Sequence, residues 1–383
     1  MAKARDLIFE DHSVDPGTHA LVIGVGKYPH LLGGGERTSP DAEGMRQLSS
    51  PPISARAFAD WLRNEYRFPD KPLASLALLL SEQVPGPDAK LANSSNVVQA
   101  VREWKARATS NPNNRLIFYF CGHGISQGED MALLLSDFGA SVDNPLDGAL
   151  DFRQLVSGLK PCAASQQLFF VDACRASTDT MIAGSGGSAG VVPLLPRGRP
   201  KPPELPPMVP ITYFATLAGS DSHARPNQAS LFTDALIKGL RGAGSDNTDD
   251  GSGWCVTTTR LQDALNHFLG EPTFAGQMAK VQIPVATELI TYDLHSLSGQ
   301  PTVPVYVRCP TPDETKRAQY VCLLKLNLEE KARREPDGKD GEKVFELPAD
   351  EYLFMATLAA EDIRTKTLTI RPVSRRLVMG AES

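Results

Sequence analysis

The 383-residue sequence has no apolar stretch approaching the roughly 18 residues needed to cross a bilayer, and its start, MAKARDLIFEDH, holds no apolar signal core. It also has no excess of basic residues, since 39 Lys and Arg stand against 45 Asp and Glu for a net charge of −6. The first absence argues against a membrane protein and the second against a nucleic-acid-binding protein. We therefore expect a cytoplasmic protein without nucleic-acid or membrane partners.

Cysteine is also scarce. Six cysteines are scattered through the chain without framework spacing, at positions 121, 162, 174, 255, 309 and 322. In a chain of this length such scattering argues against a disulfide scaffold, so most should be reduced thiols. Cys121, His123 and Cys162 lack the paired spacing of a structural zinc site, so we expect no metal there.

Alternating apolar strands and amphipathic helices dominate the first 297 residues. Buried strands are expected at 19–28, 76–80, 116–120, 168–171 and 211–217, and helices at 53–66, 97–108, 152–159 and 231–240. Ser94 and Ser95 are the candidate caps of the second helix. This order, with nearly continuous apolar strands, predicts an α/β domain over 1–297 with a mostly parallel sheet flanked by helices.

Two regions break this pattern. Residues 176–210 are rich in Gly, Ser and Pro, which predicts a long mobile loop inside the fold. After residue 297 the sequence changes to short β-like runs separated by turns, which predicts a small all-β, sandwich-like domain over 298–383. Its charged run 329–343 is expected to form an exposed hairpin loop. This domain shows no nucleophile or ligand cluster, so we expect it to dock substrate, bind an activating or adaptor protein, or regulate.

Two of the apolar strands end on reactive side chains. The run 115–124 ends on Gly-His-Gly, and the run 167–175 passes through Asp-Ala-Cys. An open α/β sheet collects its chemistry at the carboxyl ends of its strands, so His123 and Cys174 are expected to meet there. A thiol becomes a competent nucleophile when a neighbouring imidazole takes its proton. The backbone N–H groups of Gly124 and Cys174 would then hold the developing oxyanion.

His123 precedes Cys174 by 51 positions, close to the roughly 50 of caspases. With the first strand LVIGVGKY and the later SLFTDALIKGL helix, these motifs resemble caspase-like cysteine peptidases over about residues 17–290, closer to the metacaspase and bacterial branch than to animal caspases. The resemblance implies a caspase-hemoglobinase fold with a mostly parallel six-stranded sheet, a His123–Cys174 dyad and hydrolysis of protein substrates through a thioester. A non-catalytic scaffold or sensor that kept this fold remains the alternative.

The carboxylate two residues before Cys174 bears on specificity. Metacaspases are similar in having an Asp there, and the resemblance implies that Asp172 lines a pocket for Arg or Lys before the scissile bond. A structural Asp that caps the following turn or pairs with Arg175 is the alternative.

A second acidic residue is expected near the start of the first helix, where this chain has Ser54. That departure keeps open cleavage after Asp, as in animal caspases, with Arg46 or Arg56 as the recognising cation.

Two further patterns concern activation. The loop 176–210 contains Arg197, Arg199 and Lys201, which are candidate self-cleavage sites in an enzyme that prefers basic residues; an uncut surface loop is the simpler alternative. The resemblance also implies regulated limited proteolysis, in some bacterial relatives within defence or cell-death pathways.

Calcium control is a further property of metacaspases. Asp246, Asp249 and Asp250 are a weak candidate for a calcium loop, because the twelfth position is Thr257 rather than a bidentate Glu. A solvated loop is the favoured interpretation, and we expect no required cofactor.

Overall fold

The computed structural model describes residues 6–42, 44–84, 86, 88–127, 130–144, 146–174, 190–194, 209–216, 226–248, 253–270 and 283–380. The chain divides into two units. The first contains Met1–Ile237 and Leu265–Thr291, and the second contains Lys238–Ala264 and Tyr292–Ser383. The division into 1–297 and 298–383 expected from the sequence stays a prediction.

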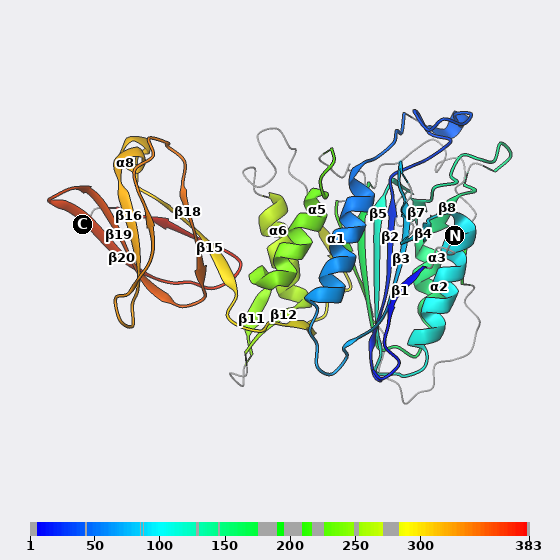
Figure 1. Ribbon diagram of the computed structural model, residues 1–383, viewed down its shortest axis with the longest axis horizontal. Helices are drawn as coiled ribbons and strands as arrows, with labels where there is room; N and C mark the ends of the chain where they lie inside the picture. The colour runs from blue at the N-terminus through cyan, green and yellow to red at the C-terminus, as the bar shows by residue number, and fades with distance from the viewer. Residues whose placement is uncertain are drawn as a thin grey trace. The chain divides into compact units, whose positions relative to one another are not determined.

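The first unit is built on one large sheet, shown edge-on in Figure 1. Its described strands follow the order β1-β3-β2-β5-β9-β10-β13, with β4 paired to β3. The parallel strands are β2 (Thr18–Val25), β3 (Leu73–Ser81), β4 (Lys90–Leu91), β5 (Arg115–Gly122), β9 (Gln166–Ala173) and β10 (Val209–Phe214). The antiparallel edges are β1 (Leu7–Glu10) and β13 (Val285–Thr287). The mostly parallel α/β fold is confirmed, with eight described strands rather than six, because the short edge strands lack long apolar runs.

Helices cover both faces of this sheet (Figure 1). Helix α1 (Ser50–Asn64) packs Phe58 on Tyr119 of β5, with ring centroids 4.7 Å apart. On the opposite face lie α2 (Ser94–Ala108) and α3 (Phe152–Leu159) (Figure 1). The ring centroids of Trp104 in α2 and Phe118 in β5 are 6.1 Å apart, in the same hydrophobic core as residues of α3. Because successive strand residues point to opposite faces, β5 serves both layers of the core. Helix α5 (Leu231–Lys238) follows β10 in the chain.

The start of α2 differs from the expectation. Asn93, not Ser94 or Ser95, is the N-cap, and its side chain accepts from the Asn96 N–H at 3.0 Å. Ser94 is already helical, and the carboxylate of Asp137 accepts its N–H at 3.0 Å. The sequence could not show that Ser94 lies inside the helix, because the Asp137 carboxylate that accepts its N–H is 43 positions away in the chain.

A small sheet follows His123 directly. Strands β6 (Gly124–Gln127), β7 (Asp130–Leu134) and β8 (Ala149–Asp151) pair antiparallel in that order. The sequence analysis did not predict them.

The predicted mobile loop 176–210 contains an anchored piece. Val191 donates its N–H to the Ala149 carbonyl at 2.6 Å and accepts from the Asp151 N–H at 3.1 Å, so it forms a bridge beside β8. The expectation of irregular structure is therefore wrong at Val191 and at Val209 and Pro210, which begin β10, because backbone pairing does not depend on side-chain type. The mobility of the loop stays a prediction. Residues 175–189 and 195–208, with Arg197, Arg199 and Lys201, lie outside the described residues.

The second unit is mainly β. One of its sheets has the order β18-β15-β21 and another the order β17-β16-β19-β20. The strands are β15 (Thr302–Arg308), β16 (Gln319–Leu324), β17 (Glu330–Arg334), β18 (Lys343–Pro348), β19 (Glu351–Ala359), β20 (Asp362–Thr369) and β21 (Arg375–Val378), and α8 (Pro312–Arg317) lies between β15 and β16. Their shared core includes Val305, Phe345 and Phe354. A third sheet joins β11 (Ser245–Asn247), β12 (Trp254–Thr257) and β14 (Asp293–Ser296), and a one-turn helix (Gly239–Ala243) precedes it in the chain. Helix α6 (Thr258–Gly270) begins in this unit, and its residues from Leu265 onward belong to the first.

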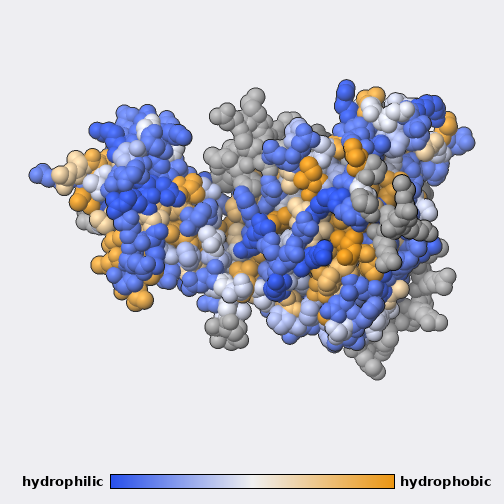
Figure 2. Space-filling view, in the orientation of Figure 1, coloured by the Kyte–Doolittle hydropathy of each residue, from blue (hydrophilic) through white to orange (hydrophobic). Residues whose placement is uncertain are grey.

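The charged run 329–343 is not a plain loop, since β17 within it pairs antiparallel with β16. The side chains of β17 are exposed apart from the half-buried Ala332, and the viewed face of this unit is largely hydrophilic (Figure 2). An edge strand of charged residues gives no apolar alternation, which explains why the pattern missed it.

Candidate active site

The two predicted reactive residues lie at equivalent positions on neighbouring strands. β5 and β9 are parallel, with Cys121 opposite Asp172 and Gly122 opposite Ala173. His123 and Cys174 are the next residue of each strand, at the carboxyl edge of the sheet, and both are half-buried. The register thus places the two residues at equivalent positions on neighbouring strands, and their pairing as a dyad stays a prediction.

Gly124 is packed tightly against the backbone of Cys174. A Cβ on Gly124 would lie 2.7 Å from the Cys174 carbonyl oxygen and 2.9 Å from the Ala173 Cβ. Both contacts are shorter than real Cβ contacts, so only glycine fits without movement. The oxyanion role of the Gly124 and Cys174 N–H groups stays a prediction.

The imidazole of His123 is held by a backbone carbonyl. Its Nε2 lies 2.7 Å from the carbonyl oxygen of Arg46. A carbonyl only accepts hydrogen bonds, so Nε2 carries the hydrogen and Nδ1 of the neutral ring keeps its lone pair. Burial lowers the pKa of His123, while the bond to Arg46 opposes that shift. The ring is therefore neutral near pH 7 and able to take a proton through Nδ1.

Tyr28 holds the backbone of the same histidine. Its hydroxyl accepts the His123 N–H at 2.9 Å, and the two rings lie 5.0 Å apart at 51°. Tyr28 follows β2, the neighbour of β5, at the same edge of the sheet. Tyr28 was not singled out from the sequence, although its position shortly after a parallel strand, like that of His123, is a signal that could have identified it.

Asp172 is only 3% exposed, and hydrogen-bond donors converge on its Oδ2. Ser230 donates through its hydroxyl, Thr233 donates at 3.0 Å, and the Cys121 thiol donates at 3.3 Å. Burial, and after it the charge of Asp172, raise the pKa of Cys121 well above its usual value, so this thiol stays protonated and donates. Ser230, Thr233 and Cys121 were not singled out from the sequence.

Near the start of the first helix, where a second acidic residue was expected, the chain has Ser54. Ser54 is fully buried, and its hydroxyl oxygen accepts the Ser230 N–H at 2.9 Å. It therefore supports a partner of Asp172 instead of adding a negative charge.

Arg46 and Arg56 were the candidate cations for recognising Asp. Arg56 binds Glu82 at 2.9 Å through Nη2 and also forms an ion pair with Asp88. Those carboxylates raise its pKa and occupy its guanidinium, which weighs against Arg56 as a substrate-binding residue. Arg46 is exposed, and it serves the site through its carbonyl.

No metal site is found in the parts of the chain that the structure describes, where no three His, Cys, Asp or Glu side chains gather around a common point. Asp246 lies in β11 and pairs with Arg260 at 3.5 Å. Asp249 and Asp250 lie outside the described residues, so the calcium loop stays a prediction.

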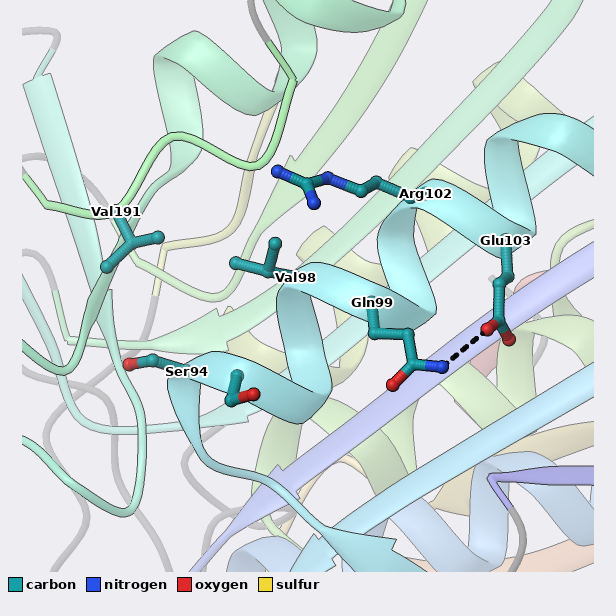
Figure 3. Close-up of a pocket in the computed structure, with 7 residues that line it drawn as sticks. Ser94, Val98, Gln99, Arg102, Glu103 and Val191 are labelled. Atoms are coloured by element: carbon teal, nitrogen blue, oxygen red, sulfur yellow. Dashed lines mark hydrogen bonds between the residues drawn. The ribbon is translucent and has the colours of Figure 1, made fainter.

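A separate hollow of about 550 Å³ lies along α2, away from these side chains (Figure 3). Residues from one side of α2 line it, and Val191 of the anchored segment faces them. None of its lining residues belongs to the strand-end site, so it does not define the chemistry.

The parallel sheet and the strand-end histidine and cysteine define the class of caspase-like cysteine peptidases. The model of the caspase domain family matches residues 18–291, and the chain belongs to this family. Because the family includes inactive members, membership shows the class of protein and leaves its catalytic activity to be tested.

Two curated relatives match part of the chain. An uncharacterised protein of Sinorhizobium fredii is 28% identical over 243 residues, 61% of this chain and 69% of that protein. A probable protease of a Desulfuromonadales bacterium is 31% identical over 186 residues, 45% of this chain and only 21% of that protein. Among solved structures, caspase-1 of Spodoptera frugiperda matches with a TM-score of 0.45 and 13% identity, over 79% of this chain and 97% of the other. None of the helices within the described ranges is long and apolar enough to cross a membrane.

Proposed function

We propose that this protein is a cysteine endopeptidase in which Cys174 is the nucleophile and His123 the general base and acid. The observation that carries this proposal is the parallel register of β5 and β9, which sets His123 and Cys174 at equivalent positions past their last paired residues. The hydrogen bond from Nε2 to the Arg46 carbonyl adds to it, because it leaves Nδ1 as the basic nitrogen.

The reaction transfers an acyl group twice. His123 takes the thiol proton while the sulfur of Cys174 attacks the peptide carbonyl carbon, and the Gly124 and Cys174 N–H groups stabilise the oxyanion. The tetrahedral intermediate collapses to a thioester as His123 gives the proton to the leaving amine. Water, activated by the same imidazole, then hydrolyses the thioester and restores the thiol.

For specificity we propose cleavage after Arg or Lys, with Asp172 recognising the cation. The support is a buried carboxylate two residues before the proposed nucleophile, whose Oδ2 accepts from Ser230, Thr233 and Cys121. A buried charge of this kind favours a cationic ligand strongly. The engagement of Arg56 with Glu82 and Asp88 argues against the alternative of cleavage after Asp through that residue.

Fluorogenic peptides ending in Arg, Lys or Asp test activity and specificity together. The wild type should cleave the Arg and Lys peptides, and Cys174→Ala should cleave none. Turnover of the Asp peptide alone would reject the basic preference while keeping the peptidase.

The second candidate function is a scaffold or sensor that binds without cleaving, which is favoured by the occurrence of inactive members in the family. A peptidyl chloromethyl ketone separates the two, because it alkylates an activated thiol. Labelling of Cys174 supports the enzyme, and absence of labelling with and without calcium and candidate activators supports the scaffold.

We further propose regulated self-processing at Arg197, Arg199 or Lys201. The anchored segment 190–194 precedes these residues and is bonded to β8 of the small sheet, and β10 of the large sheet begins at Val209 after them. Both ends of the candidate region are therefore held by strands. Wild type should give two fragments on a denaturing gel where Cys174→Ala stays intact. Replacement of all three basic residues by Gln should prevent the cut if the sites are correct.

The acyl transfers need only proton and group transfer, so we propose that no metal or cofactor takes part in the chemistry. Calcium is a separate question of regulation, tested by adding calcium and then a chelator. A calcium-dependent rise in peptide cleavage that the chelator reverses would identify a regulatory ion.

The biological role we propose is limited proteolysis of protein substrates in the cytoplasm, within a bacterial defence or cell-death pathway, with an adaptor or substrate bound by the C-terminal strands. The cytoplasmic location fits a chain in which none of the six cysteines forms a disulfide. Terminal proteomics of cells with wild type or Cys174→Ala would identify the substrates, and cell fractionation would test the location.

A further inference from the structure

Tyr28 closes a ring of hydrogen bonds around the backbone of His123. The tyrosine is fully buried; its hydroxyl accepts the His123 N–H at 2.9 Å and donates to the Leu134 carbonyl at 3.2 Å. The Leu134 N–H in turn donates to the His123 carbonyl at 2.9 Å. Both backbone polar groups of the histidine are thereby fixed, one directly by β7 and one through the phenol.

Gln47 connects Tyr28 to the residue that holds the imidazole. Its Oε1 accepts the Tyr28 N–H and its Nε2 donates to the Tyr28 carbonyl, each at 2.8 Å. Nε2 also approaches the Leu32 carbonyl at 3.3 Å. Gln47 is the chain neighbour of Arg46, whose carbonyl accepts from His123 Nε2. One side-chain amide therefore links the two groups that orient the histidine.

We propose that Tyr28 and Gln47 are positioning residues for His123, an inference that rests on the proposed peptidase function. Tyr28 sets the backbone from which the imidazole projects, and Gln47 holds Tyr28 and is the chain neighbour of Arg46, whose carbonyl binds Nε2. In the proposed mechanism, this support keeps the imidazole oriented with Nδ1 as the basic nitrogen. Small misplacements of a catalytic group cost on the order of 100-fold in rate, so these supports should be visible in kcat.

Tyr28→Phe and Gln47→Met test the proposal, since each removes hydrogen bonds while keeping most of the side-chain volume. We expect kcat to fall by about 10- to 100-fold in each, with KM within about twofold, because neither residue contacts substrate. Tyr66→Phe is the matched control. Tyr66 is also a buried tyrosine, bonded through its hydroxyl to Thr18 and Arg115 at the amino ends of β2 and β5.

The second readout is the pH dependence of Cys174 alkylation by iodoacetamide, followed by peptide mass spectrometry. A misplaced imidazole should move half-maximal alkylation toward the value of an ordinary thiol, about pH 8.5. This readout needs no turnover, so it tests positioning even if the wild type cleaves no peptide. Failure of the wild type to cleave would reject the proposed function and leave the positioning proposal to the alkylation profile.

The proposal is supported if Tyr28→Phe and Gln47→Met both lower kcat and shift the alkylation profile while Tyr66→Phe does neither. It is overturned if the two variants keep the wild-type profile, or if Tyr66→Phe loses as much kcat. Because Gln47 is only half-buried, its variant keeps the test decisive should Tyr28→Phe fail to fold.

Discussion

At the scale of single residues, Asp172 shows how a carboxyl group is accommodated in a nearly dry place. Its Oδ2 accepts from two hydroxyls and a thiol. Hydrogen bonds to a carboxylate stabilise its charged form and offset part of the cost of burial. Removing one of these donors would therefore make the burial of Asp172 more costly.

Under the proposed basic specificity, Asp172→Asn should lower kcat/KM for an Arg peptide by ~100-fold or more, because it removes the charge proposed to pair with the substrate guanidinium. Asp151→Asn is the matched control, since Asp151 is 2% exposed and caps α3 by accepting the Gln154 N–H. Kinetics with Arg peptides and alkylation of Cys174 measure the two effects separately. Unchanged kcat/KM in Asp172→Asn would remove Asp172 from the specificity pocket.

Burial of His19 should lower the free energy of unfolding at acidic pH. It is 8% exposed, and burial, with the nearby charge of Arg107, lowers its pKa from 6.5 to about 4. The unfolded chain therefore takes up the proton first, so the contribution of His19 is complete above pH 6.5 and is lost as the pH falls toward 4. We expect a loss of about 2 kcal/mol in unfolding free energy between pH 7 and pH 5.

Urea unfolding of wild type and His19→Gln at both pH values measures this effect. The variant should show the smaller pH dependence, whereas His12→Gln, which alters an exposed histidine, should match wild type. Equal pH dependence in wild type and His19→Gln would contradict the prediction.

Strand-end context was enough to predict that His123 and Cys174 lie at the same edge of the sheet, because each follows an apolar run that only a buried strand explains. Their supports were not predictable in the same way. The contacts of His123 with Tyr28 and Arg46 cross 95 and 77 positions, and that of Asp172 with Ser230 crosses 58. Such partners depend on register and loop path, which no local pattern encodes.

At the scale of elements, the anchored segment 190–194 depends on a glycine. Gly190 has φ +150°, and a Cβ there would lie 2.4 Å from the Ala149 carbonyl oxygen. Any other residue would be strained at this φ, and its Cβ would collide with the Ala149 carbonyl unless the backbone moved. The bridge between Val191 and β8 therefore requires glycine at its start.

Gly190→Ala should detach this segment from β8 and expose it to protease. We expect faster thermolysin cleavage beside Val191 and Val192, detected by mass spectrometry of the first fragments, because opened backbone is cut preferentially. Gly299→Ala is the control, since its Cβ would meet nothing within 4 Å. An unchanged cleavage pattern in Gly190→Ala would show that the bridge does not protect the segment.

The long elements were predictable and the short ones were not. Helix α2 is predicted by the helical spacing of four apolar residues, and all four are buried in the structure: Val97, Val101, Trp104 and Ala108. In contrast, β6, β8 and β17 have five residues or fewer and owe their pairing to backbone hydrogen bonds with neighbours. Sequence periodicity needs several repeats, so elements of this length escape it.

At the scale of the whole molecule, the second unit has a core of its own and none of the site residues. Phe354 is 1% exposed and packs edge-on against Phe345 at 5.7 Å. Phe354→Ala should destabilise this unit by about 3–5 kcal/mol. Calorimetry should show a lowered transition, while peptide cleavage below that transition should stay within twofold of wild type, as expected for roughly independent units.

Cleavage of a protein substrate by Phe354→Ala, above its lowered transition, tests docking. A loss of protein cleavage with peptide cleavage retained supports a docking role for the C-terminal strands. Equal loss of both would instead mean that this unit supports the fold of the first.

The place of β5 and β9 in the sheet order has a consequence for inactivation. Each has a parallel neighbour on both sides, whereas β1 and β13 are at the edges. Amide hydrogens exchange first where edge strands fray and last where central strands require global opening. The two strands that carry His123 and Cys174 should therefore be among the slowest to exchange, and heat inactivation should follow global unfolding of the sheet rather than fraying at its edges.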